Sequence, residues 1–213
     1  SLLSLEEIEA LSPTHKTVRC KGCSNSCLLT VNDFGVDAAT GKHRRFITGN
    51  RCEKGAGTLD ESKNVPNLYE YKSKRLFGYE PLAVEDAPRG SVGIPRALNL
   101  YENYPFWFTF FTKLGFQVVH SPMSSRKLYL EGQGSIPSDT ACFPAKLAHG
   151  HIEFLAKLGL DAIFYPCMTY NIDEGLGQNH YNCPVVAYYP ELLAANVPDL
   201  KQVRFLDPYV GLH

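Results

Sequence analysis

The spacing of apolar and polar residues changes along the chain and separates a small N-terminal region from a longer one. Within residues 19–54, the apolar segments CLLTVNDF and HRRFITGN flank a turn-rich DAATGK, which predicts a β-hairpin. Residues 61–90 are polar, contain proline and show no sustained period. We therefore predict a cysteine-rich hairpin domain with a lead-in helix over residues 1–60. A connecting arm should follow over residues 61–90, with one helical turn near residues 68–71.

Residues 91–213 alternate short apolar segments with longer segments of helical period. Strands are expected at SVGIPRAL, QVVHSP, DAIFYPCM, PVVAYY and KQVRFLDPYV. Helices are expected at ENYPFWFTFFTKLG, SSRKLYLEG, PAKLAHGHIEFLAKLG and PELLAAN. The first of these helices is apolar on nearly all sides, so we expect it to be buried between the sheet and another layer. Strands that alternate with helices in this way predict an α/β domain built from βαβ units.

Composition restricts the class of protein further. The 213 residues are 44% hydrophobic, which is enough for one medium domain and a small appendage. Because 21 basic residues balance 22 acidic ones, no overall field favours nucleic acid or an anionic membrane. No apolar run approaches the roughly 18 residues of a membrane span, and the first residues do not resemble a secretory signal. We therefore expect a cytoplasmic protein that binds neither nucleic acid nor membranes.

Seven cysteines are unevenly spaced, which favours metal ligands over a disulfide framework. Cys20, Cys23 and Cys27 stand together in CKGCSNSC, and Cys52 follows a hairpin's length later in NRC. A compact loop with three thiolates and a remote fourth is typical of 4Fe-4S ligation, so we predict one cluster here. Structural zinc is the alternative, since four thiolates also complete a tetrahedral site. Zinc ribbons usually present two matched CxxC pairs, and that pattern is absent from this segment.

The segment CKGCSNSCLLTV…GNRCEKG resembles the N-terminal 4Fe-4S segment of molybdopterin oxidoreductases, up to about Gly55. In that family a lysine that follows the last ligand lies on the electron path. The resemblance implies this role for Lys54, and the alternative is a solvated lysine. Basic residues also stand beside the ligands in sequence, where their charge would raise the reduction potential of an anionic cluster. They are Arg19, Lys21, Arg51 and Lys54.

A second set of cysteines falls in the predicted α/β domain. Cys142 precedes a predicted helix, Cys167 closes a predicted strand, and Cys183 ends the long loop after that strand. Ligands of α/β sheets collect at the carboxyl ends of strands, where the N-termini of helices also point, so the three thiols could converge. The alternative is that they are ordinary core residues, because free cysteine is among the most buried residue types.

The segments VGIPRALNLYENYPFWFTFFTKLGF, ACFPAKLAHGHIEFL and DAIFYPCMTY…NHYNCPVV resemble the domain attached to large activators of 2-hydroxyacyl-CoA dehydratases and benzoyl-CoA reductases, over residues 91–200. The resemblance implies a Rossmann-like α/β fold, with a mostly parallel sheet and helices on both faces, preceded here by the small cysteine-rich β-hairpin domain. It also implies that Cys142, Cys167 and Cys183 hold a second cluster. Such a site would leave one iron open to water, substrate or another ligand.

Together the two resemblances imply an oxygen-sensitive iron–sulfur redox module for low-potential electron transfer with a dehydratase- or reductase-type partner. Activators of this type carry ATPase modules that this sequence lacks, so an ATPase activator should be a separate partner, and the chain looks like an excised segment or a short relative. The rival hypothesis is a structural zinc module that scaffolds assembly with an ATPase or dehydratase subunit.

Enzymatic activity in this chain would require that the three-cysteine site is occupied and reaches a substrate. Candidate catalytic residues are Lys146 and His149, which share one face of the helix after Cys142 and could supply hydrogen bonds or protons there. Arg96 follows the first predicted strand, where it could meet an anionic acyl-CoA or the cluster. The alternatives are a polar helix face against water and a structural arginine.

Overall fold

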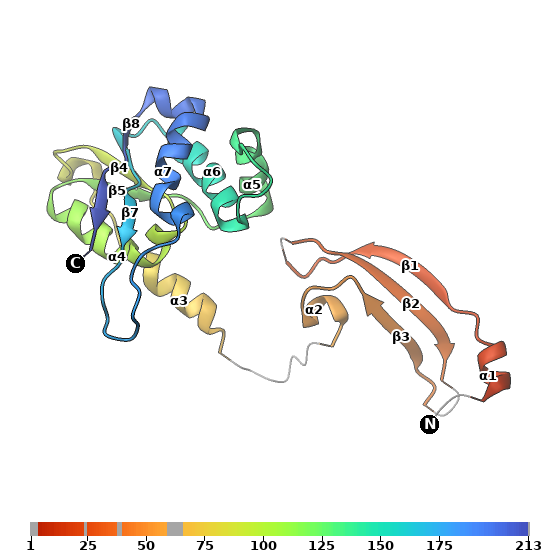
Figure 1. Ribbon diagram of the computed structural model, residues 1–213. Helices are drawn as coiled ribbons and strands as arrows, with labels where there is room; N and C mark the ends of the chain where they lie inside the picture. Colours follow the sequence, from red (N-terminus) through yellow and green to blue (C-terminus); the bar gives the residue numbers. More distant parts are fainter. Residues whose placement is uncertain (1–3, 24, 38–39, 59–65, 213) are drawn as a thin grey trace. The chain divides into compact units, whose positions relative to one another are not determined.

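The computed structural model describes residues 4–23, 25–37, 40–58 and 66–212 (Figure 1). The chain folds into two compact units, Ser1–Pro66 and Asn67–His213. Among the described residues, no helix is both long enough and apolar enough to cross a membrane.

The first unit is built on a three-stranded antiparallel sheet. After a short helix α1 (Leu5–Glu9), the strands β1 (Thr14–Arg19), β2 (Leu28–Val36) and β3 (His43–Thr48) follow one another in the order of the sequence. The predicted hairpin is confirmed as β2 and β3, and β1 is an additional strand that pairs with β2. A single turn of helix, α2 (Glu53–Ala56), follows β3.

The second unit contains a parallel sheet of order β5-β4-β6-β8. Its strands are β4 (Ser91–Ile94), β5 (Gln117–His120), β6 (Ala162–Phe164) and β8 (Arg204–Leu206). β4, the first of these strands along the chain, lies inside the sheet with β5 on one side and β6 on the other. The connection from β5 to β6 therefore crosses over β4. A second parallel pair is formed by β7 (Cys167–Tyr170) and β9 (Tyr209–Gly211).

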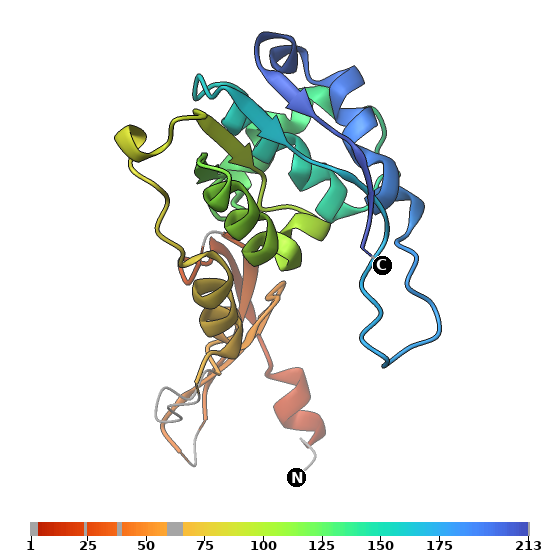
Figure 2. The ribbon, with the colours of Figure 1, turned by 90° about the vertical axis from the view of Figure 1, so that its left-hand side faces the viewer.

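Helices pack on both faces of the parallel sheet (Figures 1 and 2). They are α4 (Asn99–Lys113), α6 (Phe143–Ala156) and α7 (Pro184–Asn196), while α5 (Arg126–Gly132) packs against α6. The connection from β4 to β5 runs in one direction along the sheet, and the later connections to β6 and β8 run in the other. Because crossovers are right-handed, α4 lies on one face and α6 and α7 lie on the other. Short 3-10 turns lie at Val84–Asp86, Gln133–Ser135 and Pro198–Gln202. The predicted α/β class, with its parallel sheet and separate antiparallel hairpin region, is confirmed.

Two predicted strands are each divided in the structure. DAIFYPCM forms β6 and then β7, and KQVRFLDPYV forms β8 and then β9. Pro166 and Pro208 stand at these two divisions, and proline has no N–H to donate to a strand ladder. The Cys167 N–H nevertheless donates to the Pro208 carbonyl at 2.9 Å, which joins the two short strands just beyond the break.

Three other predictions about local structure are wrong. PVVAYY is the first half of α7 and not a strand, because Pro184 at the first helical turn and the burial of Ala187 and Tyr189 override its β-propensity. The aromatic helix α4 is not buried on all sides, since Phe106 and Phe110 are 51% and 45% exposed. The region near residues 68–71 is a ten-residue helix, α3 (Leu68–Phe77), which belongs to the second unit.

The core of the second unit lies on both faces of the sheet and is rich in aromatic rings. Trp107 and Phe111 of α4 pack on Phe164 of β6, with ring centroids 4.6 and 4.9 Å away. On the other face α5 and α6 approach closely at two glycines: a Cβ on Gly132 would collide with the backbone of Gly150. These contacts fix α6, whose N-terminus carries one of the candidate ligands.

Candidate functional site

The four N-terminal cysteines lie in two loops at one end of the antiparallel sheet. The connection between β1 and β2 carries Cys20, Cys23 and Cys27. Because β3 runs antiparallel to β2, it ends at the same end of the sheet, and Cys52 then takes the N-cap position of α2. The Cys20 N–H donates to the Cys27 carbonyl at 2.8 Å, which closes the base of the first loop. All four thiols are free, and those of Cys23 and Cys52 are exposed.

The two loops meet at Gly22. Its N–H donates to the Sγ of Cys20 at 3.4 Å. A Cβ placed on Gly22 would lie 3.4 Å from that sulfur and 3.5 Å from the Cβ of Lys54, so Lys54 of α2 packs directly beside the first loop. Across the described ranges, no three His, Cys, Asp or Glu side chains are arranged to hold a metal ion. The fold therefore brings the loops together without placing the thiols as a finished ligand group.

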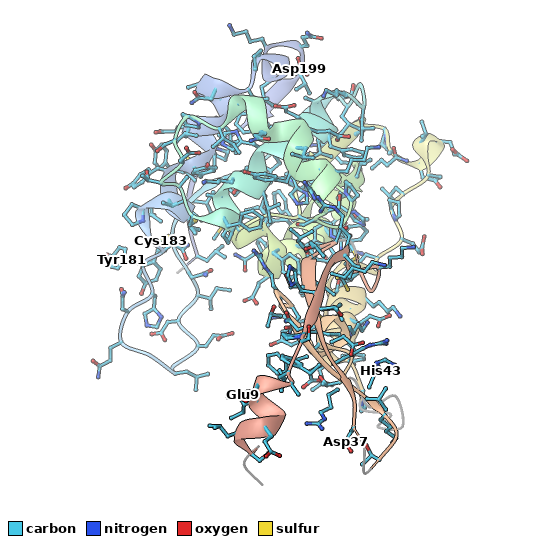
Figure 3. All side chains as sticks on the ribbon, turned by 90° about the vertical axis from the view of Figure 1, so that its right-hand side faces the viewer. Glu9, Asp37, His43, Tyr181, Cys183 and Asp199 are labelled. Carbon is cyan, nitrogen blue, oxygen red and sulfur yellow. The ribbon has the colours of Figure 1, made fainter. Side chains whose placement is uncertain are left out.

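The second set of thiols lies at one edge of the α/β unit. Cys142 and Cys183 are the N-cap residues of α6 and α7, and Cys167 is the first residue of β7, just beyond the carboxyl end of β6. Cys142 and Cys183 are exposed and Cys167 is buried. The segment between β7 and α7 is a long loop, and Figure 3 shows Cys183 at its end beside Tyr181. The Cys183 sulfur accepts from the Val186 N–H at 3.5 Å.

Two buried tyrosines lie near these thiols. Burial raises the pKa of Tyr165, and the side chains of Tyr189, Cys167 and Cys142 raise it further. Burial also raises the pKa of Tyr189 to about 12, again with a contribution from Cys142. The Tyr165 hydroxyl is fully buried and has no hydrogen-bond partner among the residues that the structure describes. A buried hydroxyl without a partner is costly, so this edge has an unsatisfied polar group next to the thiols.

Tyr189 begins a buried chain of hydrogen bonds that ends at Glu153. The Ser135 hydroxyl faces two oxygen acceptors at 3.0 Å, the Gly132 carbonyl and the Glu153 carboxylate, so its hydrogen points to one of them. Its oxygen then accepts from His149 Nδ1 at 2.9 Å, and His149 Nε2 accepts from the Tyr189 hydroxyl at 3.0 Å. Burial lowers the pKa of His149 to about 4, which keeps the imidazole neutral at pH 7.

The candidate catalytic residues have separate surroundings. His149 is fully buried, so the alternative that the polar face of α6 lies against water is wrong for this residue. Lys146 donates from Nζ to the Asp139 carbonyl at 2.6 Å and so holds the loop before Cys142. Arg96 follows β4, where its guanidinium lies 3.9 Å above the ring of Phe77.

Sequence reasoning did not identify the tyrosines or the serine of this edge. Tyr165, Tyr189 and Ser135 belong to no motif, and they lie far from one another along the chain. The usable signal was indirect: Tyr165 lies in the predicted strand DAIFYPCM, two residues before Cys167, and Tyr189 comes six residues after Cys183. Both tyrosines are therefore expected near the edge of the sheet that carries the thiols.

Comparison with known proteins assigns the second unit to a family. No curated protein and no solved structure matches the chain. A family model described as CoA enzyme activase uncharacterised domain (DUF2229) matches residues 91–213, which include every element from β4 to β9 and all three thiols of the second set. This match confirms the resemblance of the region to an activase-associated domain, and it covers more than half of the chain. The chain therefore belongs to the CoA enzyme activase uncharacterised domain family.

Proposed function

We propose that this chain is an iron–sulfur protein that transfers low-potential electrons within a CoA enzyme activase system. The observation that carries the proposal is the meeting of two loops with four free thiols at Gly22. Four thiolates with this spacing match the ligand set of a 4Fe-4S cluster, which would supply reversible one-electron chemistry. Cys20, Cys23, Cys27 and Cys52 would hold it, and closing the site would bring together four sulfurs that the described residues do not already arrange as a ligand group.

Lys54 would tune this cluster. Its Cβ already lies against Gly22, on the same side as the Cys20 sulfur. A positive charge next to a cluster with four thiolate ligands stabilises the added electron, so it raises the reduction potential. The N–H of Gly22, which donates to the Cys20 sulfur, acts in the same direction.

A second cluster at Cys142, Cys167 and Cys183 is the finer part of the proposal. Two features support it. The N-termini of α6 and α7, helices of 14 and 13 residues, both carry a cysteine at the N-cap, where the helix dipole favours a thiolate. The Tyr165 hydroxyl is buried beside Cys142 and Cys167 without a partner, and a ligand bound there would supply one.

The partners follow from the family description. An activase-related domain would work with an ATPase activator module and with a dehydratase- or reductase-type enzyme. In this arrangement the described domains carry electrons, while ATP hydrolysis and the chemistry on the CoA ester take place in other domains of the system. Such low-potential clusters are oxygen-sensitive, so the system would operate under anaerobic conditions in the cytoplasm.

Anaerobic reconstitution with iron and sulfide tests the proposal. Iron analysis and EPR of the reduced protein should give about four irons per chain for one cluster and about eight for two. Cys20→Ser should abolish the signal of the hairpin cluster, and Cys142→Ser should remove the second cluster alone. Arg89→Gln, far from both sets of cysteines in sequence, is a control that should keep all iron. One zinc per chain and no reconstitutable absorbance would refute the redox function in favour of a structural zinc module.

A further inference from the structure

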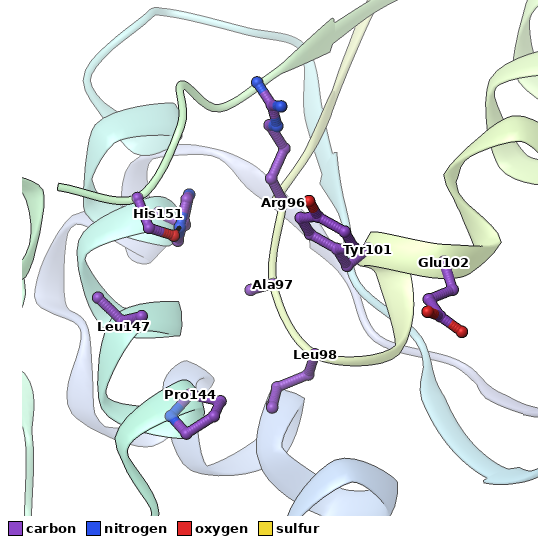
Figure 4. Close-up of a pocket in the computed structure, with 9 residues that line it drawn as sticks. Arg96, Ala97, Leu98, Tyr101, Glu102, Pro144, Leu147 and His151 are labelled. Atoms are coloured by element: carbon purple, nitrogen blue, oxygen red, sulfur yellow. Dashed lines mark hydrogen bonds between the residues drawn. The ribbon is translucent and has the colours of Figure 1, made fainter. Parts of the chain in front are cut away.

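A pocket of about 420 Å³ lies in the α/β unit, beyond the carboxyl end of β4 (Figure 4). The turn after β4 forms one wall through Arg96, Ala97 and Leu98, and the face of α6 between Pro144 and His151 forms the opposite wall. This volume is within the range of small-molecule sites, and the carboxyl edge of a parallel sheet is where such sites usually form. Leu98 has a φ of 48°, a backbone conformation that a leucine adopts only when its surroundings impose it.

A directed chain of hydrogen bonds ends in this pocket. The backbone N–H of Arg96 can only donate, and it donates to the Ser121 hydroxyl at 2.8 Å. The Ser121 hydroxyl then donates its hydrogen to His151 Nδ1, 2.7 Å away, which is its acceptor among the described residues. A neutral His151 therefore carries its hydrogen on Nε2, which donates to the Ser124 oxygen at 2.9 Å. The Ser124 hydroxyl is left with a free hydrogen, so it acts as a donor at the pocket wall.

The charges around the pocket also favour an acceptor. Arg96 lines it, and no carboxylate pairs with this guanidinium among the residues that the structure describes. One of its nitrogens donates to the Ser73 hydroxyl at 3.3 Å, and its face lies on Phe77, which leaves its other N–H groups available. Glu102 is the acid among the lining residues, and its carboxylate is bound by Lys72 Nζ at 2.6 Å.

The rest of the wall is apolar. Leu98, Tyr101, Pro144 and Leu147 line it, and Figure 4 shows Leu98, Pro144 and Leu147 around its lower end while the Arg96 guanidinium lies at the upper end. A ligand that suits this distribution has an anionic acceptor at one end and a hydrophobic body. A neutral ligand would leave the charge of the Arg96 guanidinium without a counter-charge.

We propose that this pocket binds a small organic carboxylate, with its carboxylate near Arg96 and Ser124 and its apolar body between α4 and α6. The proposal goes beyond electron transfer and requires no metal, because none of the lining residues used here is a cysteine. A planar guanidinium with free N–H groups suits a carboxylate, which it can bind through two parallel hydrogen bonds. The pocket is too small to enclose a whole coenzyme A thioester, so the free acid is the expected ligand.

Calorimetric titration of the full chain, as purified and without added iron, tests the proposal. The probes are phenylacetate and its neutral counterpart phenylacetamide, at millimolar concentrations. Phenylacetate should bind at least about tenfold more tightly than the amide, since a charge-assisted hydrogen bond is lost with the charge. Equal binding of acid and amide, or no binding of the acid at these concentrations, would overturn the proposal. Binding of coenzyme A in preference to the free acid would overturn it as well.

Variants locate the site. Arg96→Gln should weaken phenylacetate binding about tenfold and leave the amide unchanged, while the matched control Arg89→Gln, exposed at the amino end of β4, should bind like the parent. If Arg96→Gln does not fold, Ser124→Ala decides, because Ser124 is exposed and its change should still weaken the acid several-fold. Unchanged binding in the folded variants would place the ligand elsewhere and refute the assignment. The titration needs no iron, so it can succeed or fail whether or not the chain binds a cluster. Failure of the electron-transfer proposal is therefore distinguishable from failure of this one.

Discussion

Acidification should destabilise the α/β unit through two buried histidines. His149 and His151 are fully buried, and burial lowers the pKa of each from 6.5 to about 4, with a further contribution from Arg96 at His151. Between these values the unfolded chain binds protons that the folded chain does not. The free energy of unfolding must therefore rise with pH from about 4 to about 6.5, and the stabilisation is lost as the pH falls through that window.

The magnitude follows from the two pKa values. At pH 5 the unfolded imidazole is almost fully protonated while the folded one is mostly neutral, which costs about 2 kcal/mol for each histidine relative to pH 7.5. Together His149 and His151 should remove about 4 kcal/mol at pH 5. This is a large fraction of the 5–15 kcal/mol that typically stabilises a domain.

Trp107 provides the assay, because it is the one tryptophan of the chain and lies buried in the α/β unit. Urea unfolding followed by its fluorescence at pH 7.5 and pH 5 gives the two free energies. His149→Gln, which keeps a donor and acceptor near Tyr189, should halve the difference between them. His15→Gln, an exposed change on β1, should leave it unchanged. Equal free energies at the two pH values in the parent chain would refute the conclusion that both imidazoles stay neutral when folded.

Other consequences concern packing and access. Gly150→Ala should destabilise the α/β unit by about 1–3 kcal/mol or more, because the new Cβ would collide with the Leu128 carbonyl of α5. Urea unfolding measures this loss, and a neutral effect would mean that α5 is free to move. Phe111→Ala should cost about 3–5 kcal/mol and Phe110→Ala much less, since the first is 6% and the second 45% exposed; equal losses would contradict the assigned faces of α4. In the metal-free chain, iodoacetamide should alkylate the exposed Cys142 well before Cys167, because Cys167 is buried and burial raises the pKa of its thiol. Mass spectrometry of the peptides would show the reverse order if the assigned burial is wrong.

The sequence predicted the α/β class because its local signals agree with the tertiary structure. Pro144 at the first turn of α6 and the glycine after its end mark that helix, and short apolar segments mark the parallel strands. The errors occurred where local preference and packing disagree. Val185 and Val186 favour a strand in isolation, yet Pro184 before them starts a helix whose inner face is buried. Sequence alone has no measure of that burial.

The candidate site was only partly predictable, for a related reason. The cysteines stand out by spacing and by residue type, and the predicted helix after Cys142 is confirmed as α6. The helix after Cys183 was predicted as a strand, so the N-cap position of this cysteine was missed. The hydrogen bond between His149 and Tyr189 joins residues 40 positions apart, and common polar residues form it. Such pairs leave no periodic signal, so only the folded chain reveals them.

The two thiol sites differ in what a metal would have to organise. At the α/β edge, Cys142, Cys167 and Cys183 stand on backbone that a parallel sheet and two helices already fix. In the hairpin, the thiols stand on loops held by short-range contacts, among them the Cys20–Cys27 and Ser26–Cys23 backbone bonds and the packing at Gly22. If the proposed metal binds at the hairpin, we expect it to supply part of the free energy that orders those loops, as it does in small metal-binding domains. We therefore expect the hairpin loops to gain order if metal is bound, whereas the α/β unit should keep its fold without metal.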